Sequence, residues 1–219
     1  MPDAKNDAIR LAESYADRGD PNGWFEEFYG LAEGDIHKIY WADLAPNPCL
    51  VSWLEANATR GLARSTVIGC GLGDDAELLA RHGYEVTAFD ISASAVDMCR
   101  RRYPDSSVKY LEADLFDVPK DWIRGFDLVF ECNTIQILVG DQRTQCREAI
   151  AELVAPDGVA LVSCRSREPG QEADGFPVPL DRDEIDGFQI SGLSEEQFDA
   201  YDDEQDPPVP HFFAVYRRL

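Results

Sequence analysis

The stretch Val67–Ala80, VIGCGLGDDAELLA, constrains the fold more than any other part of the chain. A short apolar run leads into Gly69, Gly71 and Gly73, after which apolar residues recur at helical spacing. A glycine turn between a strand and a helix is the first half of a strand–helix–strand unit, whose two strands lie parallel. The stretch therefore predicts an α/β fold built on a parallel sheet.

The chain beyond residue 60 repeats this alternation of apolar runs and helical patterns. We expect strands at Ser65–Ile68, Glu85–Asp90, Val108–Glu112, Phe126–Glu131 and Val159–Cys164, and helices at Asp74–His82, Ser92–Arg102 and Asp141–Val154. Strands that alternate with helices favour a parallel sheet covered on both faces. The pattern predicts a Rossmann-like, doubly wound, mostly parallel sheet of seven strands.

The C-terminal part departs from the alternation. A Pro-Asp-Gly sequence at 156–158 ends the helix Asp141–Val154. Farther along the chain, a short helix near Asp181–Asp186 leads to the run Phe188–Tyr201. His211–Arg217 has the composition of a strand. We therefore expect a terminal antiparallel hairpin, with an antiparallel C-terminal strand, at one edge of the sheet.

The first sixty residues form a separate pattern. Ala8–Asp17 and Trp24–Tyr29 have helical spacing, and Asp43–Pro48 reads as a loop. The aromatic residues of this part are Trp24, Phe25, Phe28, Tyr29, Tyr40 and Trp41. We expect residues 1–60 to be a helical cap across one end of the sheet and 61–219 to be the sheet domain, within a single compact unit.

The glycine turn also limits the ligand. A dinucleotide-binding turn reads G-x-G-x-x-G, with pyrophosphate at the helix N-terminus, but here Asp74 replaces the last glycine and Asp75 follows. Both charges would repel pyrophosphate, and no Gly-Lys-Ser/Thr of a Walker loop is present. The turn favours a nucleoside ligand that lacks pyrophosphate and bears positive charge, such as S-adenosylmethionine. The alternative for both aspartates is ordinary capping of the helix.

Further candidate ligand residues lie where successive strands end. Asp90, with Ile91 beside it, ends the second strand, where a carboxylate can accept from both ribose hydroxyls. Asp114 either accepts from the adenine amino group, with Leu115 against the ring, or forms a turn. Glu131 either faces the methionine moiety or the acceptor, or is a plain strand-end carboxylate. The expected cofactor-binding set from the sheet is Gly69, Cys70, Gly71, Gly73, Asp90, Ile91, Asp114, Leu115 and Glu131, and no metal ligand is expected.

The segments GCGLG, AFDIS, EADLFDVP and FDLVFE resemble, in order and spacing, those of the class I S-adenosylmethionine-dependent methyltransferases over about residues 60–165. GWFEEFY and WADLAPNPCLVSWL before them resemble more narrowly the thiopurine methyltransferase-like branch, which acts on small molecules. This resemblance implies that Trp24 and Trp41 close over the cofactor. Cys132 stands where the thiopurine enzymes carry an arginine, which argues against thiopurine acceptors.

The resemblance implies methyl transfer from S-adenosylmethionine, with S-adenosylhomocysteine as product, to a small acceptor such as a thiol or another heteroatom nucleophile. A thiolate needs mainly alignment, whereas a hydroxyl or amine needs a base. His37 and His211 could supply that base only if the cap and the tail fold over the pocket; the alternative is that each is exposed or satisfied within the core. The alternatives are a catalytically silent protein that binds the same cofactor and, more remotely, an NAD-dependent oxidoreductase.

Composition bounds the partners and the compartment. The formal net charge of −22 repels nucleic acid and anionic membranes, so we expect neither as a partner. This charge reflects either a generally acidic surface or a salty environment. The polar start MPDAKNDAIRLAESYADRG lacks a signal-peptide pattern, and the six cysteines are scattered singly. These features predict a cytoplasmic protein with reduced thiols, and they leave the oligomeric state open.

Overall fold

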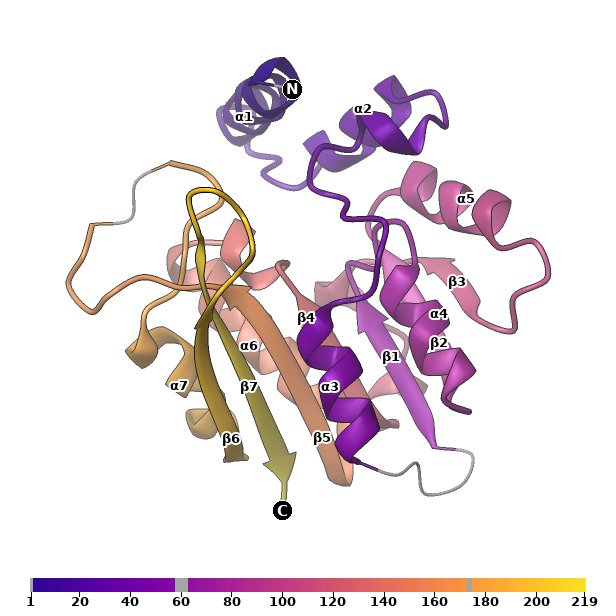
Figure 1. The fold of residues 1–219 in the computed structure, drawn as a ribbon, viewed down its shortest axis with the longest axis vertical. Coiled ribbons are helices and arrows are strands. Elements are labelled where there is room, and N and C mark those ends of the chain that lie inside the picture. The colour runs from indigo at the N-terminus through magenta and orange to yellow at the C-terminus, as the bar shows by residue number, and fades with distance from the viewer. Residues whose placement is uncertain (1, 58–62, 173–174) are drawn as a thin grey trace.

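The structure is a computed structural model that describes residues 2–57, 63–172 and 175–219 (Figure 1). Its centre is a seven-stranded sheet in the order β3-β2-β1-β4-β5-β7-β6. The strands are β1 (Arg64–Ile68), β2 (Glu85–Asp90), β3 (Lys109–Glu112), β4 (Phe126–Cys132), β5 (Val154–Arg165), β6 (Leu193–Asp202) and β7 (Pro210–Arg218). The mostly parallel, Rossmann-like sheet expected from the sequence is confirmed. The strand that runs antiparallel to both its neighbours, β7, lies one place in from the edge, which β6 occupies.

Helices cover both faces of this sheet. They are α1 (Pro2–Ala16), α2 (Trp24–Leu31), α3 (Pro48–Ala56), α4 (Asp74–Arg81), α5 (Ala93–Arg102), α6 (Gly140–Leu153) and α7 (Arg182–Ile190), with short 3₁₀ turns η1 (Ile36–Lys38), η2 (Leu115–Asp117), η3 (Lys120–Trp122) and η4 (Ile135–Ile137). One core layer joins α3, α4 and α5 to the sheet, and the other joins α6 and α7 to its opposite face. No helix in the described part of the chain is both long and apolar enough to cross a membrane.

Two C-terminal elements differ from the expected boundaries. The strand β5 begins at Val154, directly after α6, so that the Pro-Asp-Gly sequence lies inside it beside a register shift against β4. The helix α7 continues to Ile190 and includes Phe188, which was expected in an extended run. Phe188 is fully buried and stacks on Tyr216 of β7 at a centroid distance of 5.1 Å. Core burial of this aromatic ring favours the longer helix.

The helix α3 was not expected, because its segment was read only as a loop ending at Pro48. The side chain of Asn47 accepts hydrogen bonds from the backbone N–H groups of Cys49 and Leu50, and Pro48 occupies the first helical turn. An N-cap asparagine followed by proline is a strong start signal for a helix. Leu50 and Leu54 are buried against the sheet, so α3 belongs to the sheet's covering layer.

The helices α1 and α2 lie beyond the carboxyl ends of the parallel strands (Figure 1). They have a separate apolar core, which includes Ala8, Trp24, Phe28 and Tyr29 and reaches the sheet domain through Leu72 and Met98. The carboxyl ends of parallel strands are where ligands bind in open α/β sheets. The N-terminal helices therefore cover the end of the sheet at which a site is expected.

Candidate functional site

The glycine turn follows β1 and needs glycine for two reasons. Gly69, Gly71 and Gly73 all have left-handed backbone angles, with φ of +56°, +53° and +87°. A side chain at the first or third of these positions would also collide with the hydroxyl group of Thr134 or of Tyr110. The middle glycine has more space and is the point at which the backbone of the turn faces the cap. The turn is therefore shaped for close approach of a ligand to its backbone.

Asp90 ends β2 and holds this turn in place. Its two carboxylate oxygens accept hydrogen bonds from the backbone N–H groups of Gly71 and Ser92, each at 3.0 Å. The residue is buried, with 6% of its surface exposed, and burial raises the pKa of its carboxyl group. Each carboxylate oxygen can accept a second hydrogen bond, so the group can still receive two hydroxyl donors. The neighbouring Ile91 is 36% exposed, which makes an apolar surface available beside the carboxylate.

The helix α2 lies directly over the turn. The hydroxyl of Tyr29 is the nearest group to a side chain placed at Gly71, and it accepts a hydrogen bond from the indole nitrogen of Trp41 at 3.3 Å. Burial and the charge of Asp90 raise the pKa of this tyrosine well above its ordinary value, so it stays a neutral hydroxyl. Sequence reasoning placed Tyr29 only within the aromatic cluster. No sequence signal links it to the turn.

Glu26 fixes α2 to the sheet domain. Its carboxylate accepts hydrogen bonds from the Ser92 hydroxyl at 2.7 Å, the Ser94 backbone N–H at 3.0 Å and the Ser94 hydroxyl at 2.7 Å. Although partial burial opposes it, these hydrogen bonds lower the pKa of the carboxyl. Ser92 also caps α5 and follows Asp90 by two residues. The contact between cap and sheet is therefore made beside the candidate ribose site.

The aromatic residues of the cap form one layer. Trp24 is 2% exposed and lies edge-on to Trp41 at 6.0 Å and to Phe176 at 5.6 Å. Trp41 is half-buried and stacks on Phe28 at 4.6 Å. Trp41 thus contacts Tyr29, the residue that lies over the glycine turn. Trp24 contacts Phe176 in the segment after β5. That both close over a cofactor stays a prediction.

The two aspartates that follow the glycine turn, Asp74 and Asp75, have different partners in the structure. The carboxylate of Asp74 forms an ion pair with Arg102 at 2.7 Å and accepts from the Tyr103 hydroxyl at 3.0 Å. The carboxylate of Asp75 accepts from the backbone N–H of Asn47 at 2.7 Å, and burial raises its pKa to about 6. Both lie in the first turn of α4, where carboxylates are favourable. Arg102 pairs with Asp74, which weakens the repulsion of pyrophosphate by this residue, and the exclusion of dinucleotides by the two aspartates stays a prediction.

Glu131 lies near the carboxyl end of β4, where the sequence predicts it. It has no exposed surface, and one carboxylate oxygen accepts from the backbone N–H groups of Thr134 and Ile135 at 2.5 and 2.9 Å. Its other oxygen has no hydrogen-bond partner in the described part of the chain, and burial raises its pKa to about 7. One carboxylate oxygen thus supports the turn after β4, and a contact of Glu131 with the methionine moiety or the acceptor stays a prediction.

Asp114 and Leu115 lie at the carboxyl end of β3. The Asp114 side chain accepts from the backbone N–H of Phe116 at 2.9 Å, as the turn alternative requires, and it remains exposed. Leu115 is 9% exposed and belongs to the core on the α6 face. Contacts of this pair with adenine therefore stay a prediction, and the exposed carboxylate is the better placed of the two.

Buried thiols surround the turn. Cys70 hydrogen-bonds to Cys99, which donates to the Gly71 carbonyl at 3.1 Å, and this contact together with burial raises the pKa of Cys70 well above its ordinary value. Burial, and then the charges of Asp75 and Glu131, raise that of Cys132. The raised pKa values of Cys70 and Cys132 keep these two thiols protonated near neutral pH, which disfavours either as a nucleophile.

Neither candidate base lies free in a site. His37 is exposed. His211 is 9% exposed, stacks on Tyr201 at 5.5 Å and has Nδ1 2.9 Å from the Val209 carbonyl. Both positions match the structural alternative that the sequence left open.

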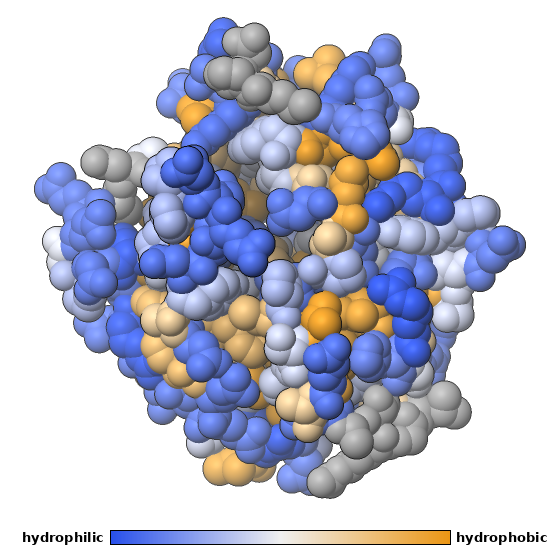
Figure 2. All heavy atoms as spheres, viewed as in Figure 1, coloured by the Kyte–Doolittle hydropathy of each residue, from blue (hydrophilic) through white to orange (hydrophobic). Residues whose placement is uncertain are grey.

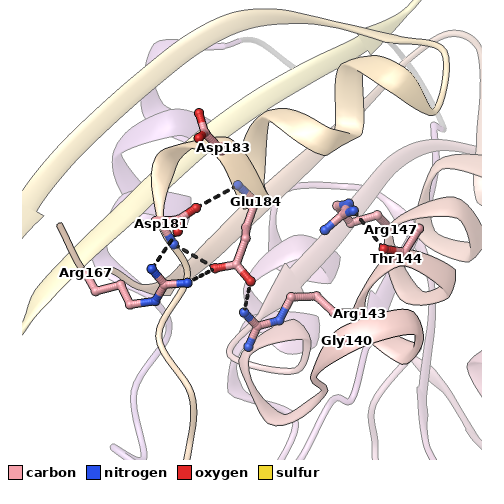
Figure 3. Close-up of a pocket in the computed structure, with 8 residues that line it drawn as sticks. All are labelled: Gly140, Arg143, Thr144, Arg147, Arg167, Asp181, Asp183 and Glu184. Atoms are coloured by element: carbon pink, nitrogen blue, oxygen red, sulfur yellow. Dashed lines mark hydrogen bonds and ion pairs between the residues drawn. The ribbon is translucent and has the colours of Figure 1, made fainter. Parts of the chain in front are cut away.

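A cavity of about 440 Å³ lies between α6 and α7. Charged side chains that line it form an ion-pair network (Figure 3). Arg143, 3% exposed, pairs with Glu184 at 2.5 Å, and Arg167 pairs with Asp181 at 2.5 Å and with Glu184 at 2.7 Å. Asp181 and Glu184 also form a capping box at the start of α7. These charges neutralise one another, so the network anchors α7 and is not a ligand site.

The order of the strands, the glycine turn after β1 and the buried carboxylate that ends β2 form the arrangement at which open α/β sheets bind nucleosides. Residues 67–158 match the family described as "Methyltransferase domain". Among solved structures, Burkholderia thailandensis 1,6-didemethyltoxoflavin-N1-methyltransferase with bound 1,6-didemethyltoxoflavin and S-adenosylhomocysteine has the same fold, with a TM-score of 0.70 at 16% identity over 95% of this chain and 90% of that chain.

Two curated proteins are similar in sequence. A cypemycin N-terminal methyltransferase from Streptomyces sp is 30% identical over 150 residues, which cover 65% of this chain and 60% of the relative. A ubiquinone biosynthesis O-methyltransferase from Xanthomonas campestris pv. campestris (strain B100) is 32% identical over 127 residues, which cover 57% of this chain and 52% of the relative. The chain thus spans between half and about three fifths of the length of these relatives.

The matched domain, these relatives and the shared fold support a class I S-adenosylmethionine-dependent methyltransferase, and S-adenosylmethionine is the cofactor of that class. The narrower resemblance to the thiopurine branch stays a prediction.

Proposed function

We propose that this protein transfers the methyl group of S-adenosylmethionine to a small-molecule acceptor. The observation that carries the proposal is Asp90, a buried carboxylate that is bonded to the backbone of the glycine turn and keeps two acceptor positions free. In the left-handed glycine turn beside it, the backbone at Gly71 faces the cap, with the Tyr29 hydroxyl opposite. These residues fit a nucleoside with an unphosphorylated ribose.

The chain's residues have distinct roles in this proposal. Asp90 accepts from the ribose hydroxyls, Ile91 offers apolar surface to the adenine, and Asp114 accepts from its amino group. The cofactor supplies a methyl group on a positively charged sulfonium. The aromatic layer that ends at Trp41 attracts such a cation through the ring faces and excludes water from it.

The acceptor atom is a finer question. The relatives are named for N-terminal, O- and N1-methyl transfer. A sulfur acceptor needs only alignment with the methyl group, whereas oxygen or a protonated amine needs a base. Asp75 lies in the first turn of α4, directly after the glycine turn, and burial raises its pKa to about 6, so it can take up a proton near neutral pH. We propose it as that base for acceptors that need one.

Calorimetric titration with S-adenosylmethionine, S-adenosylhomocysteine and NAD tests the proposal. The wild-type protein should bind the first two and not NAD. Asp90→Ala should weaken binding at least about tenfold, because a hydrogen bond to a charged group contributes about 1.5–3 kcal/mol. Asp97→Ala is the matched control, since Asp97 is an exposed carboxylate on the neighbouring helix α5.

Thermal unfolding of both variants checks that the loss is not a loss of fold. Binding of NAD, or unchanged cofactor affinity in folded Asp90→Ala, would overturn the proposal. Cofactor binding without methyl transfer to any thiol, amine or hydroxyl acceptor would favour the silent binding protein.

A further inference from the structure

A second cavity, of about 380 Å³, lies beneath α1 at the carboxyl end of β5. Its apolar walls come from Ile9 of α1, Phe176 and Pro179 of the segment after β5, and Val209 before β7. Figure 2 shows the surface hollowed below the N-terminal helices on this face of the molecule. The volume falls within the roughly 300–1,000 Å³ of small-molecule sites.

The aromatic layer joins this cavity to the glycine turn. Phe176 lines the cavity and contacts Trp24, whose ring lies 6.0 Å from Trp41. Trp41 in turn donates to Tyr29, which lies over Gly71. The cavity is thus connected to the candidate cofactor site by one continuous series of aromatic contacts.

The cavity carries positive charge that the protein itself does not neutralise. Lys5 and Arg165 line it, and neither side chain has an ion pair or hydrogen bond within the ranges that the structure describes. Arg167 also lines it but is paired with two carboxylates, and Glu172 is the exposed carboxylate among the lining residues. Two unpaired cations against one carboxylate contrast with the chain's net charge of −22.

Arg165 is held in place by its backbone and leaves its guanidinium available. Its N–H donates to the Gln136 side chain at 2.7 Å, and its carbonyl accepts from the Leu180 backbone N–H at 3.0 Å. The guanidinium lies close enough to Tyr40 for its charge to lower the tyrosine's pKa, although burial raises that pKa overall. A planar guanidinium beside apolar walls matches a planar carboxylate, which it binds through two parallel hydrogen bonds.

We propose that this cavity is the acceptor site and that Arg165, assisted by Lys5, binds a carboxylate on the acceptor. The substrate class is then a small apolar or aromatic acid that carries the methyl-accepting atom at a distance from its carboxylate. This inference rests on the proposed function.

The test uses matched pairs of probes with the cofactor product present. The full chain is saturated with S-adenosylhomocysteine and titrated with para-mercaptobenzoate, para-hydroxybenzoate and para-aminobenzoate, and with the three corresponding benzamides. At least one carboxylate should bind tenfold or more tightly than its isosteric amide. Arg165→Gln should remove that preference, and Lys5→Gln should reduce it, because a hydrogen bond to a charged partner is about twice as strong as a neutral one.

Arg10→Gln is the matched control, since Arg10 lies on α1 next to the cavity residue Ile9 but points to solvent and pairs with Asp7. It should leave the preference unchanged. Carboxylates that bind no tighter than their amides, or that fail to bind at all, would overturn the inference. So would a preference that survives in a folded Arg165→Gln protein with normal cofactor affinity. Failure of the wild-type protein to bind S-adenosylhomocysteine is a separate outcome, which overturns the proposed function.

Discussion

Glu131 is a carboxyl group without exposed surface at the end of β4, and its pKa is raised from 4.5 to about 7 by burial. Between those two pH values the folded protein holds a proton that the unfolded chain has released. Stability therefore decreases as pH rises through this window, and the contribution is complete only below it. In Glu131→Gln this dependence should be absent. The free energy of unfolding of the wild type should fall, relative to the variant, by about 3 kcal/mol between pH 4.5 and 7.5.

Urea unfolding at both pH values measures this difference. Glu112→Gln serves as the control, because Glu112 also ends a strand, β3, but is exposed. Its pH profile should run parallel to that of the wild type. A Glu131→Gln profile that also runs parallel would show that this carboxyl titrates normally.

At the scale of the residue, the sequence identifies positions with a structural role more readily than it identifies the contacts of those residues. Gly69, Gly71 and Asp90 could be found because their roles depend on local backbone geometry and on strand ends. The partner of Asp74 could not, because Arg102 is brought to it by the packing of α5 against α4. Glu131 looked like a strand-end carboxylate open to ligand, and only the turn after β4 shows that it points into the core.

At the scale of the element, α2 depends on a single carboxylate for its polar contact with α5. Glu26→Ala removes three hydrogen bonds to Ser92 and Ser94. The apolar contacts of the cap remain, so we expect local opening and not unfolding. Amide hydrogen exchange in α2 should accelerate at least about tenfold, since hydrogen bonds to a charged group contribute about 1.5–3 kcal/mol.

The adjacent residue provides the control for this variant. Glu27 accepts from the Tyr15 hydroxyl at 2.6 Å, a contact between α1 and α2 within the cap. Glu27→Ala should therefore affect exchange near the end of α1 and leave the region of Ser92 protected. Equal exchange rates in α2 for Glu26→Ala and wild type would mean that apolar packing alone holds the cap.

The attachment of α7 to α6 depends on Arg143. This arginine is 3% exposed and pairs with Glu184 (Figure 3). It also donates to the Leu138 and Val178 carbonyls, each at 2.8 Å. Breaking a buried pair by removing one partner costs about 3–5 kcal/mol. Arg143→Ala should lower the free energy of unfolding by about 3 kcal/mol in urea. Arg124→Ala, which removes an exposed pair with Glu152, should change it by less than about 1 kcal/mol. Similar losses in the two variants would contradict a buried network.

At the scale of the whole molecule, the sheet and its strand order follow from alternation and from short connections, both of which the sequence displays. The cavity under α1 does not, because it brings together residues 5 and 9, residues of 165–172 and 175–179, and residues 209–210. Such distant segments meet only through the packing of the cap on the sheet. The glycine turn is a local sequence feature, so it could be predicted as a cofactor site. The acceptor site combines distant segments, so a proposal about the acceptor needs the structure.

The net charge of −22 is a property of the whole molecule with a consequence for stability. Mutual repulsion of surface carboxylates destabilises the compact state, and it is screened when the Debye length shrinks from about 10 Å at 0.1 M salt to about 3 Å at 1 M. Exposed ion pairs are weakened by the same screening, but each contributes only about 0–1 kcal/mol. The free energy of unfolding in urea should therefore rise, by on the order of 1–2 kcal/mol, between 0.1 and 1 M sodium chloride. At pH 4.5, where many carboxylates are protonated, the gain should be clearly smaller, so a gain that is equal at both pH values would assign the effect to the salt's action on apolar surface instead.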